Sequence, residues 1–437
     1  MIKKINTMNT VLKREGVFGF VKLARVKFLC GLYGLLAVPF FLIILLFYPI
    51  LRIRLIPLFS FRIGHYALNA ELFLCAFDSK VYDKNKRILT LFYTLTEGPI
   101  CNSQLHKMWK RCVPILPFPA ICIQLDRFLC LFFGEKYKDN LKEYFGSTIG
   151  SYDRWGYLER PRSHLSFTLI EKKKARIMME KFGVPIDASF VCILGRDALY
   201  LEKQLPGRDY SHHDYRNVDI NTYRESALFL AEQGYYVFRM GKYVKSAFDV
   251  DHPRIIDYAN HPLRSDFMDI YLVSHCYFMM SCSSGMDSVA QLFRRPLLIT
   301  NICLPDIRGF YFWKIFIPKK IIDSRTKKLI PFKEVYKVFI DAPLGRVIDT
   351  LKKYGWELVD NSPEEILEAT KEMLALLSCS DEASCKPHEL QEKFWKEFHD
   401  NVIEPLPIFN PEGAEVKSKK IRVGTAFLEK YRDLISS

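Results

Sequence analysis

A cluster of small polar residues follows the apolar run CYFMMS and comprises Ser283, Ser284, Gly285 and Asp287. A small polar turn that opens a helix presents backbone N–H groups and hydroxyls, and a helix N-terminus favours a phosphate. We therefore predict that this turn binds the diphosphate of a ligand. The alternative on local sequence is an ordinary serine cap, in which Asp287 complements the helix dipole.

Cationic and aromatic side chains follow two further apolar runs. FVCIL is followed by Gly195 and Arg196, and then by a loop that contains His213, Tyr215, Arg216 and Asn217. YYVFRM ends in a second cationic group beside a glycine, made of Arg239, Gly241 and Lys242. Arginine can bind a phosphate through two parallel hydrogen bonds. Ligands of open α/β sheets bind at the carboxyl ends of strands, so we expect these residues to bind the same diphosphate.

One histidine of the N-terminal half is our candidate for proton transfer. His65 ends the segment RIGH, after the apolar run LIPLFSF, and Glu71 lies on the helix expected to follow. A near-neutral pKa suits the deprotonation of an acceptor hydroxyl. We predict that His65 is the general base and that Glu71 is the second catalytic candidate. The alternative is a structural histidine.

Metal and cofactor sites receive little support from the sequence. His212 and His213 are adjacent but lack further ligands at the spacing of a zinc site. The triplet Asp249-Val250-Asp251 has the DxD form but precedes a His-Pro loop. The 12 cysteines form no CxxC pair, which favours buried thiols in a reducing compartment. We expect neither a bound metal nor a cofactor.

Helix-like segments alternate with the apolar runs, which indicates parallel sheet units. A chain of 437 residues with 49% apolar residues suits two domains with appendages. Short continuous apolar strands between helices are typical of a doubly wound fold. We predict an α/β protein with one domain over residues 55–162, a second over residues 163–378, a linker-like stretch near residues 134–165, and a helical tail over residues 379–437.

The first 54 residues predict an attachment to a membrane. The first 60 residues carry a net charge of +8 out of +14 for the chain, and Phe28–Leu51 is a run of 24 residues without a charge. Basic residues flank this run on both sides, so we expect membrane lipids, and not nucleic acid, as the partner. The run is too long for a secretory signal, and Ile50-Leu51-Arg52 is no small-residue cleavage site.

Two prolines favour a hairpin over a single spanning helix. Pro39 lies in the middle of the run and Pro49 near its end, and an interior proline breaks or kinks a helix. The positive-inside rule keeps the basic leader in the cytosol, so a single crossing would export the rest of the chain. We predict an amphipathic helix and then a membrane hairpin that turns at Pro39, at the cytoplasmic face of the inner membrane. A spanning helix and a buried core helix are the alternatives.

Several segments resemble a group of bacterial glycosyltransferases from surface-polysaccharide and lipopolysaccharide gene clusters. They are HDYRN, YYVFRMG, IIDYA, FMDIYLVSHC, the SSG turn before FRRP, RIGH with NAELFL, and VDNSPEEILEATKEM. The resemblance covers about residues 55–375. It implies the GT-B architecture of two facing Rossmann-like domains, the first for the acceptor and the second for a nucleotide sugar. In the GT-B pattern an acidic residue on the helix after the glycine turn holds the donor ribose, and Asp287 is the acidic residue nearby.

The sequence thus leads to one preferred function and two alternatives. We expect a glycosyltransferase that moves a sugar from a nucleotide-sugar donor to a lipid-linked or lipopolysaccharide glycan acceptor. A nucleotide-sugar 2-epimerase on the same fold would carry paired glutamates after the glycine turn, where this chain has Ser288 and Val289. The second alternative, a non-catalytic membrane scaffold, would bind no donor.

Overall fold

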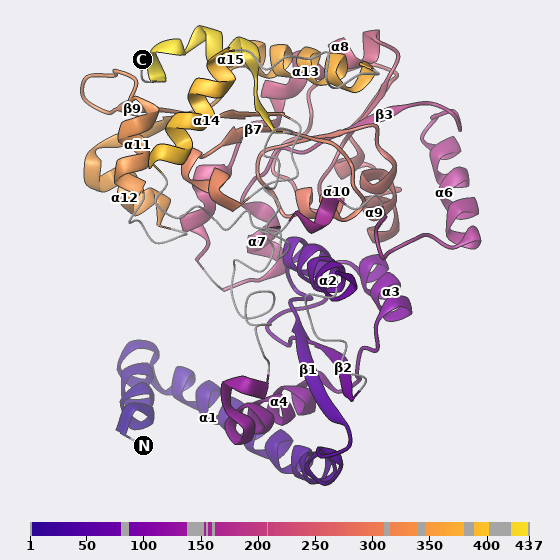
Figure 1. The fold of residues 1–437 in the computed structure, drawn as a ribbon, viewed down its shortest axis with the longest axis vertical. Coiled ribbons are helices and arrows are strands. Elements are labelled where there is room, and N and C mark those ends of the chain that lie inside the picture. The colour runs from indigo at the N-terminus through magenta and orange to yellow at the C-terminus, as the bar shows by residue number, and fades with distance from the viewer. Residues whose placement is uncertain are drawn as a thin grey trace.

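The structure is a computed structural model that describes residues 2–79, 87–137, 153, 156–159, 162–207, 209–309, 315–339, 346–379, 389–401 and 421–435. Most of the linker-like stretch predicted near residues 134–165 lies outside the described residues. The described elements run from an N-terminal helix through a small α/β domain into a larger one (Figure 1).

The larger domain is built on a sheet of seven parallel strands in the order β11-β8-β7-β6-β3-β4-β5. The strands are β3 (Phe190–Ile193), β4 (Tyr236–Arg239), β5 (Ile255–Ile256), β6 (Met279–Ser281), β7 (Leu297–Ile302), β8 (Ile315–Pro318) and β11 (Arg422–Val423). Their side chains are almost all buried, as expected for a parallel sheet that is covered on both faces. The predicted doubly wound α/β class is confirmed.

Helices cover both faces of this sheet (Figure 1). α8 (Arg224–Glu232) and α13 (Pro363–Ser378) pack on one face, and α9 (Asp266–His275) and α10 (Asp287–Leu292) lie on the other. Serine caps start two of them: Ser265 accepts a hydrogen bond from the N–H of Met268, and Ser362 forms a capping box. The remaining elements of the larger domain are α6 (Leu169–Lys181), α7 (Leu199–Gln204), α11 (Phe332–Phe339), α12 (Val347–Tyr354), α14 (Glu389–Asn401), α15 (Thr425–Lys430) and the antiparallel pair β9 (Lys320–Asp323) and β10 (Trp356–Val359).

The smaller domain contains two parallel strands, β1 (Arg52–Leu58) and β2 (Ile88–Thr94). A single parallel bridge joins Ile115 to Phe92 of β2. The helices are α2 (Ile63–Asp78), α3 (Ser103–Cys112) and α4 (Pro119–Phe133). Among the described residues this domain is therefore smaller than the Rossmann-like unit that we expected, and its first strand begins before the predicted boundary at residue 55.

α2 is the layer that joins the two domains. It lies between the β1–β2 pair and α10 of the larger domain (Figure 1). Most of its residues are buried on all sides, from Tyr66 to Ala76, and they belong to one apolar core with the seven-stranded sheet. A second, separate core joins α1, β1, β2 and α4 at the base of the molecule.

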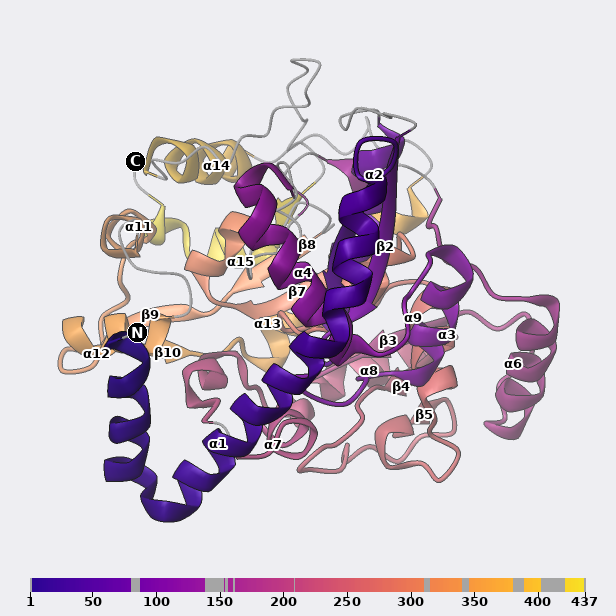
Figure 2. The same cartoon turned by 90° about the horizontal axis from the view of Figure 1, so that it is seen from below.

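The N-terminal segment differs from the predicted hairpin. α1 is helical from Ile2 to Phe47 and continues through Pro39, so the turn predicted there is wrong. A proline removes one backbone N–H from the helix ladder. The helix persists because Ala37 and Phe41, on either side of Pro39, both pack into the core shared with α4. Seen from below, α1 runs across the underside of the molecule beside α4 (Figure 2).

The C-terminal residues also differ from the predicted helical tail. β11 pairs with β8 and forms the edge of the seven-stranded sheet, so the tail belongs to the larger domain. The side chain of Gln391 brackets this short strand through hydrogen bonds with both the N–H and the C=O of Val423. A strand of two residues carries no periodicity that sequence analysis could detect.

Candidate functional site

A cleft of about 620 Å³ opens between the two domains. It lies at the carboxyl ends of β3, β4 and β6 and is closed on the other side by the N-terminus of α2. The chain goes outward from β3 to β4 and β5, and then crosses back to β6 on the other side of β3. This reversal is a topological switch point, which is where ligands bind in open α/β sheets.

Most of the predicted site residues line this cleft. From the larger domain they are Gly195, Arg196, His213, Tyr215, Arg216, Gly241, Lys242, Ser283, Ser284 and Gly285, and from the smaller domain His65. Residues that are far apart in the sequence thus converge because parallel strands end at one edge of the sheet. Lys242 also contacts the facing domain, since its Nζ donates a hydrogen bond to the Cys101 carbonyl at 3.0 Å.

Three arginines of the cleft have no carboxylate partner within the part of the chain that the structure describes. They are Arg62 at the start of α2, Arg196 after β3, and Arg216. Arg196 donates hydrogen bonds to the His213 carbonyl at 3.1 Å and to the side chain of Asn217. Burial and the charge of Arg216 lower the pKa of Arg196 to about 10. Positive charges this close repel one another, so a bound anion would be favourable here, as in other clefts lined by charges of one sign.

His213 lies among these three cations and remains neutral. Burial lowers its pKa to about 2, together with the charges of Arg216, Arg196 and Arg62. The guanidinium of Arg216 donates a hydrogen bond to His213 Nδ1 at 2.6 Å, which requires an unprotonated acceptor. His213 therefore orients Arg216 toward the cleft. Tyr215 is fixed in a similar way, because its hydroxyl donates to Asp306 at 2.8 Å.

His65 faces the same cleft from the N-terminus of α2. Burial lowers its pKa to about 4, and the charges of Arg62 and Arg216 contribute. Its Nδ1 is buried and has no hydrogen-bond partner among the described residues. His65 is therefore neutral at physiological pH, and its basicity without a ligand is weak.

The turn of Ser283, Ser284 and Gly285, which we predicted to bind a diphosphate, forms hydrogen bonds within the protein. Ser284 donates both its N–H, at 2.8 Å, and its hydroxyl, at 2.9 Å, to the carboxylate of Asp287. Asp287 is buried, which raises its pKa to about 6, and it does not line the cleft. Ser283 has a left-handed φ of 62°. The carboxylate of Asp287 therefore holds the turn in shape, as in the capping alternative.

Gly285 is needed for the contact between the domains. A Cβ added to Gly285 would lie 3.0 Å from Ile63 Cγ2 and 3.2 Å from the backbone nitrogen of Gly64. A Cβ added to Gly64 would in turn lie 3.1 Å from the Cα of Gly285. The two glycines thus allow the turn before α10 to touch the N-terminus of α2. From the sequence, we predicted that this glycine has a role in binding a diphosphate.

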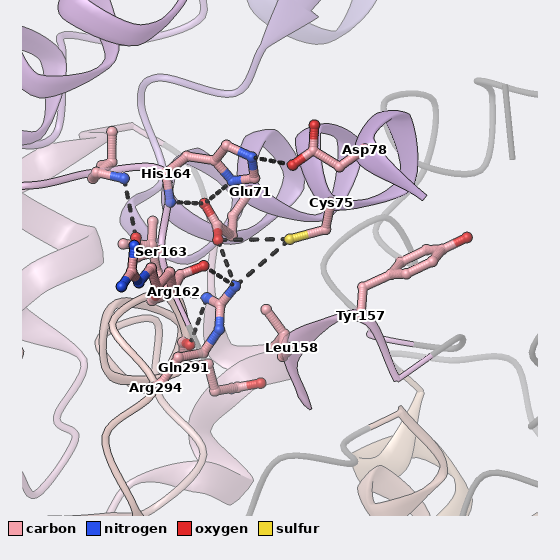
Figure 3. A network of polar contacts seen from close by, with 12 residues as sticks. Glu71, Cys75, Asp78, Tyr157, Leu158, Arg162, Ser163, His164, Gln291 and Arg294 are labelled. Atoms are coloured by element: carbon pink, nitrogen blue, oxygen red, sulfur yellow. Dashed lines mark hydrogen bonds and ion pairs between the residues drawn. The ribbon is translucent and has the colours of Figure 1, made fainter. Parts of the chain in front are cut away.

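Glu71 lies outside the cleft, in a buried network that joins the domains (Figure 3). Its side chain is 0% exposed. One carboxylate oxygen accepts from Arg294 at 2.7 Å, and the other accepts from the backbone N–H of His164 at 3.3 Å and contacts its ring at 3.1 Å. Burial alone would lower the pKa of His164, but hydrogen bonds with Cys75 and Glu71 and the charge of Glu71 raise it to about 10. This geometry gives Glu71 a structural role in place of the predicted catalytic one.

Two further predicted residues have their side chains turned away from the cleft. Arg239 is 1% exposed and pairs with Asp257 at 3.1 Å. Asn217 accepts from Arg196 and donates to Asp214 at 2.9 Å, so it supports a cleft residue without lining the cleft. Arg239 is the last residue of β4 and Asn217 lies in the long loop after β3, and neither position specifies to which side its side chain points.

Glu71, Cys75 and His164 bring ligand-type atoms within 4.8 Å of one another, as a metal site would. However, the guanidinium of Arg294 contacts Glu71 Oε1 at 2.7 Å and Cys75 Sγ at 3.6 Å. The positive charge that a metal ion would bring is thus supplied by the arginine. The residues Asp249 and Asp251 of the DxD triplet are absent from the lining of the cleft.

Sequence reasoning missed several residues that line the cleft. They are Asn102, Asp197, Tyr200, Asp269, Asp306 and Arg346. Asp197 belongs to the same run as Gly195 and Arg196 after β3, but it was given no role. Arg346 immediately precedes α12, and no local pattern distinguishes it from a surface arginine.

Comparisons with protein-family models and with curated proteins find no match. Among solved structures, the chain is similar to the E. coli ADP-heptose LPS heptosyltransferase II at 12% identity and a TM-score of 0.37, over 75% of this chain and 100% of that one. It is also similar to a family 9 glycosyl transferase from Veillonella parvula, at 10% identity and a TM-score of 0.40, over 74% and 97%. A third likeness is to S. aureus MnaA with UDP, at 13% identity and a TM-score of 0.25, over 94% and 83%. At TM-scores below 0.5 these likenesses do not assign a function.

Proposed function

We propose that this chain is a GT-B glycosyltransferase that uses a nucleotide-sugar donor. The observation that carries the proposal is the group of Arg62, Arg196 and Arg216, which lack carboxylate partners within the described residues and face one cleft at the switch point of the sheet. Unpaired cations in a cleft are costly unless an anionic ligand is present. A nucleoside diphosphate supplies such charge, and a cleft of about 620 Å³ falls in the range of small-molecule sites.

The arginines would act on the leaving group of the reaction. As the bond between the sugar and the diphosphate breaks, negative charge accumulates on the phosphate oxygens. Preorganised donors aimed at developing charge are usually the largest catalytic contribution. Arg196 and Arg216 extend from the domain of the seven-stranded sheet, and Arg62 reaches the same charge from the other domain. His213 holds Arg216 in place through the 2.6 Å contact.

His65 would accept the proton of the acceptor hydroxyl. Its pKa without a ligand is lowered to about 4, first by burial and then by Arg62 and Arg216. A bound diphosphate would offset the charge of both arginines, and the pKa of His65 would rise toward the range of an effective base. Binding of the donor would thus activate the base, which links proton transfer to occupancy of the donor site.

The acceptor would be a lipid-linked or lipopolysaccharide glycan at the cytoplasmic face of the inner membrane. The support is α1, which over Leu23–Phe47 has a mean hydropathy of 2.6 and is long and apolar enough to cross a membrane. Residues on both sides of the apolar run are basic.

A thermal-shift panel of nucleoside diphosphates and their sugar conjugates tests the proposal. A selective ligand at 100 times its Kd adds about 2.7 kcal/mol of stability. We expect one nucleoside diphosphate and its sugar conjugates to stabilise the protein, whereas free nucleosides do not. A panel without a stabilising diphosphate, at concentrations up to the millimolar range, would contradict the proposed donor class.

A further inference from the structure

α4 presents large apolar side chains to solvent at the base of the smaller domain. Leu131 is 83% exposed, Phe132 is 63% exposed, and Phe118, just before the helix, is 70% exposed. Scattered apolar residues on a surface need no explanation, but contiguous ones mark an interaction site. α4 packs along α1, with the Phe132 ring 5.8 Å from that of Phe41, and α1 is itself exposed along most of its apolar length.

α1 is fixed to α4 along one stripe. Its stripe residues recur at alternating spacings of three and four: Gly34, Ala37, Phe41, Ile44 and Tyr48. On α4 they meet the rings of three phenylalanines. Phe41 lies 5.7 Å from Phe128 and 5.8 Å from Phe132, and Tyr48 stacks on Phe133 at 3.9 Å between ring centroids. This is the packing of two helices in a folded domain and differs from that of a free anchor.

The opposite side of α1 remains uncovered. Phe28, Leu35, Leu42 and Leu46 are 73%, 70%, 57% and 73% exposed. At 3.6 residues per turn these four positions fall on one face, away from the stripe that meets α4. The exposed Leu36, Phe40 and Phe47 continue this apolar surface around the flank of α1 toward α4. Exposed basic residues stand at both ends of the apolar run, with Arg25 and Lys27 before it and Arg52 after it.

The arrangement of the elements restricts how α1 can enter a bilayer. α1 runs across the base of the molecule, transverse to its long axis (Figures 1 and 2). It shares its core with Leu55 of β1 and Tyr93 of β2. If α1 stood upright and crossed the bilayer, α4 and the ends of both strands would follow it into hydrocarbon. The buried Asp126, which accepts from Tyr93 at 2.7 Å, would then enter the bilayer too.

We infer that α1 and α4 together form a platform that docks on the surface of an anionic lipid bilayer without crossing it. The platform comprises the exposed face of α1 (Phe28, Leu35, Leu42 and Leu46) and Leu131 and Phe132 of α4. Its apolar residues enter the headgroup and upper acyl region, and Arg25, Lys27 and Arg52 meet lipid phosphates. Both ends of the apolar run then stay on one side of the membrane. The inference concerns lipid alone and does not depend on the proposed sugar chemistry.

Flotation with phosphatidylethanolamine–phosphatidylglycerol vesicles tests the contribution of α4. Leu131→Glu should weaken partitioning of the full chain by about 10-fold, because burial of a leucine is lost. Ile170→Glu is the matched control, since Ile170 is 80% exposed but lies on α6 of the larger domain. We expect the control to partition like the wild type. Equal partitioning of all three proteins would overturn the role of α4. An unchanged melting temperature of Leu131→Glu verifies that the fold is retained.

The oligomeric state in solution separates lipid from a second copy of the chain as the occupant of this surface. If the wild type dimerises without lipid, and Leu131→Glu dissociates the dimer without changing flotation, the platform is a dimer interface and the inference is wrong. We expect no such pair of results.

Labelling of the two ends of α1 tests the orientation. Arg25→Cys and Arg52→Cys, compared with the unsubstituted protein, should both react with a membrane-impermeant maleimide in inverted inner-membrane vesicles. Neither should gain reactivity in intact spheroplasts. If one position reacts only from outside, α1 crosses the membrane and the platform is wrong.

Discussion

The two halves of α2 both carry ionisable side chains, but they differ in how the charges of these side chains are compensated. At its N-terminal end, Arg62 and His65 face the cleft, and Arg62 pairs with no carboxylate among the described residues. In its C-terminal half, Glu71 is enclosed by Arg294 and His164, and Asp78 contacts the far side of the same imidazole at 3.1 Å. The charge of Arg62 in the first group can therefore pair with an anionic ligand. In the second group, each charged side chain already pairs with one of opposite charge.

This contrast shows how one helix can serve both binding and stability. Unpaired charge is tolerated at the cleft because a ligand can compensate it. Paired charge below the cleft fixes the distance between the domains, since Arg294 reaches Glu71 from the far end of α10. Substitutions in the two halves should therefore have separable effects, one on ligand affinity and the other on folding.

The largest expected effect comes from breaking the buried network. Arg294→Ala leaves Glu71 buried with a histidine as its remaining charged partner, and removing one member of a buried ion pair costs about 3–5 kcal/mol. Chemical denaturation should show this loss. Lys393→Ala is the control, because its pair with Glu389 is 49% and 77% exposed, and it should cost at most about 0.5 kcal/mol. An Arg294→Ala protein as stable as the control would refute the structural role of the network.

Removal of a cleft arginine should instead affect activity. Arg216→Ala takes away one donor to the leaving diphosphate, and we expect kcat/KM to fall about 100-fold, on the order of 2.7 kcal/mol. Stability should change little. Arg224→Ala serves as the control, since Arg224 is 55% exposed and lies outside the cleft. If both variants keep wild-type turnover, the cationic cluster has no catalytic role.

The glycine contact between the domains should have an intermediate effect. Gly285→Val forces a side chain against Ile63 and the backbone of Gly64, and overpacking of this kind costs about 1–3 kcal/mol. Gly31→Val is the control, because an added Cβ there meets nothing within 4 Å. Thermal unfolding in detergent measures both. A Gly285→Val protein that melts like the wild type would show that the domains are not in contact at this position.

The smallest effect should be a pH dependence of stability. The pKa of His164 is raised to about 10 in the folded protein, above its ordinary value of 6.5. Its contribution is therefore complete below pH 6.5 and is lost as the pH rises toward 10. We expect a loss of about 1–2 kcal/mol between pH 7 and pH 9, reduced from the full linkage value by partial exposure. Unfolding of His164→Asn should lack this slope, and an equal slope in both proteins would contradict the assignment.

The sequence predicted the elements and the strand ends better than the direction of individual side chains. Short apolar strands between capped helices indicated the α/β class, and residues that follow those strands line the cleft. Glu71 could not be assigned in this way, because its partner Arg294 lies 223 positions further along the chain. From the sequence, Gly285 was predicted to bind a ligand, whereas in the structure its close contact with Gly64 of the other domain leaves no room for a side chain. Pro39 was expected to end a helix that tertiary packing preserves.

Titration calorimetry with nucleoside diphosphates tests the central claim, that the unpaired arginines of the cleft bind a diphosphate donor. One nucleoside diphosphate should bind the wild type, more weakly as salt increases, because the contacts are between charges. Arg216→Ala should weaken this binding by about 10-fold or more, since hydrogen bonds to charged groups contribute about 1.5–3 kcal/mol. His65→Ala should bind nearly as well as the wild type. Loss of binding in His65→Ala, or unchanged binding in Arg216→Ala, would contradict the account.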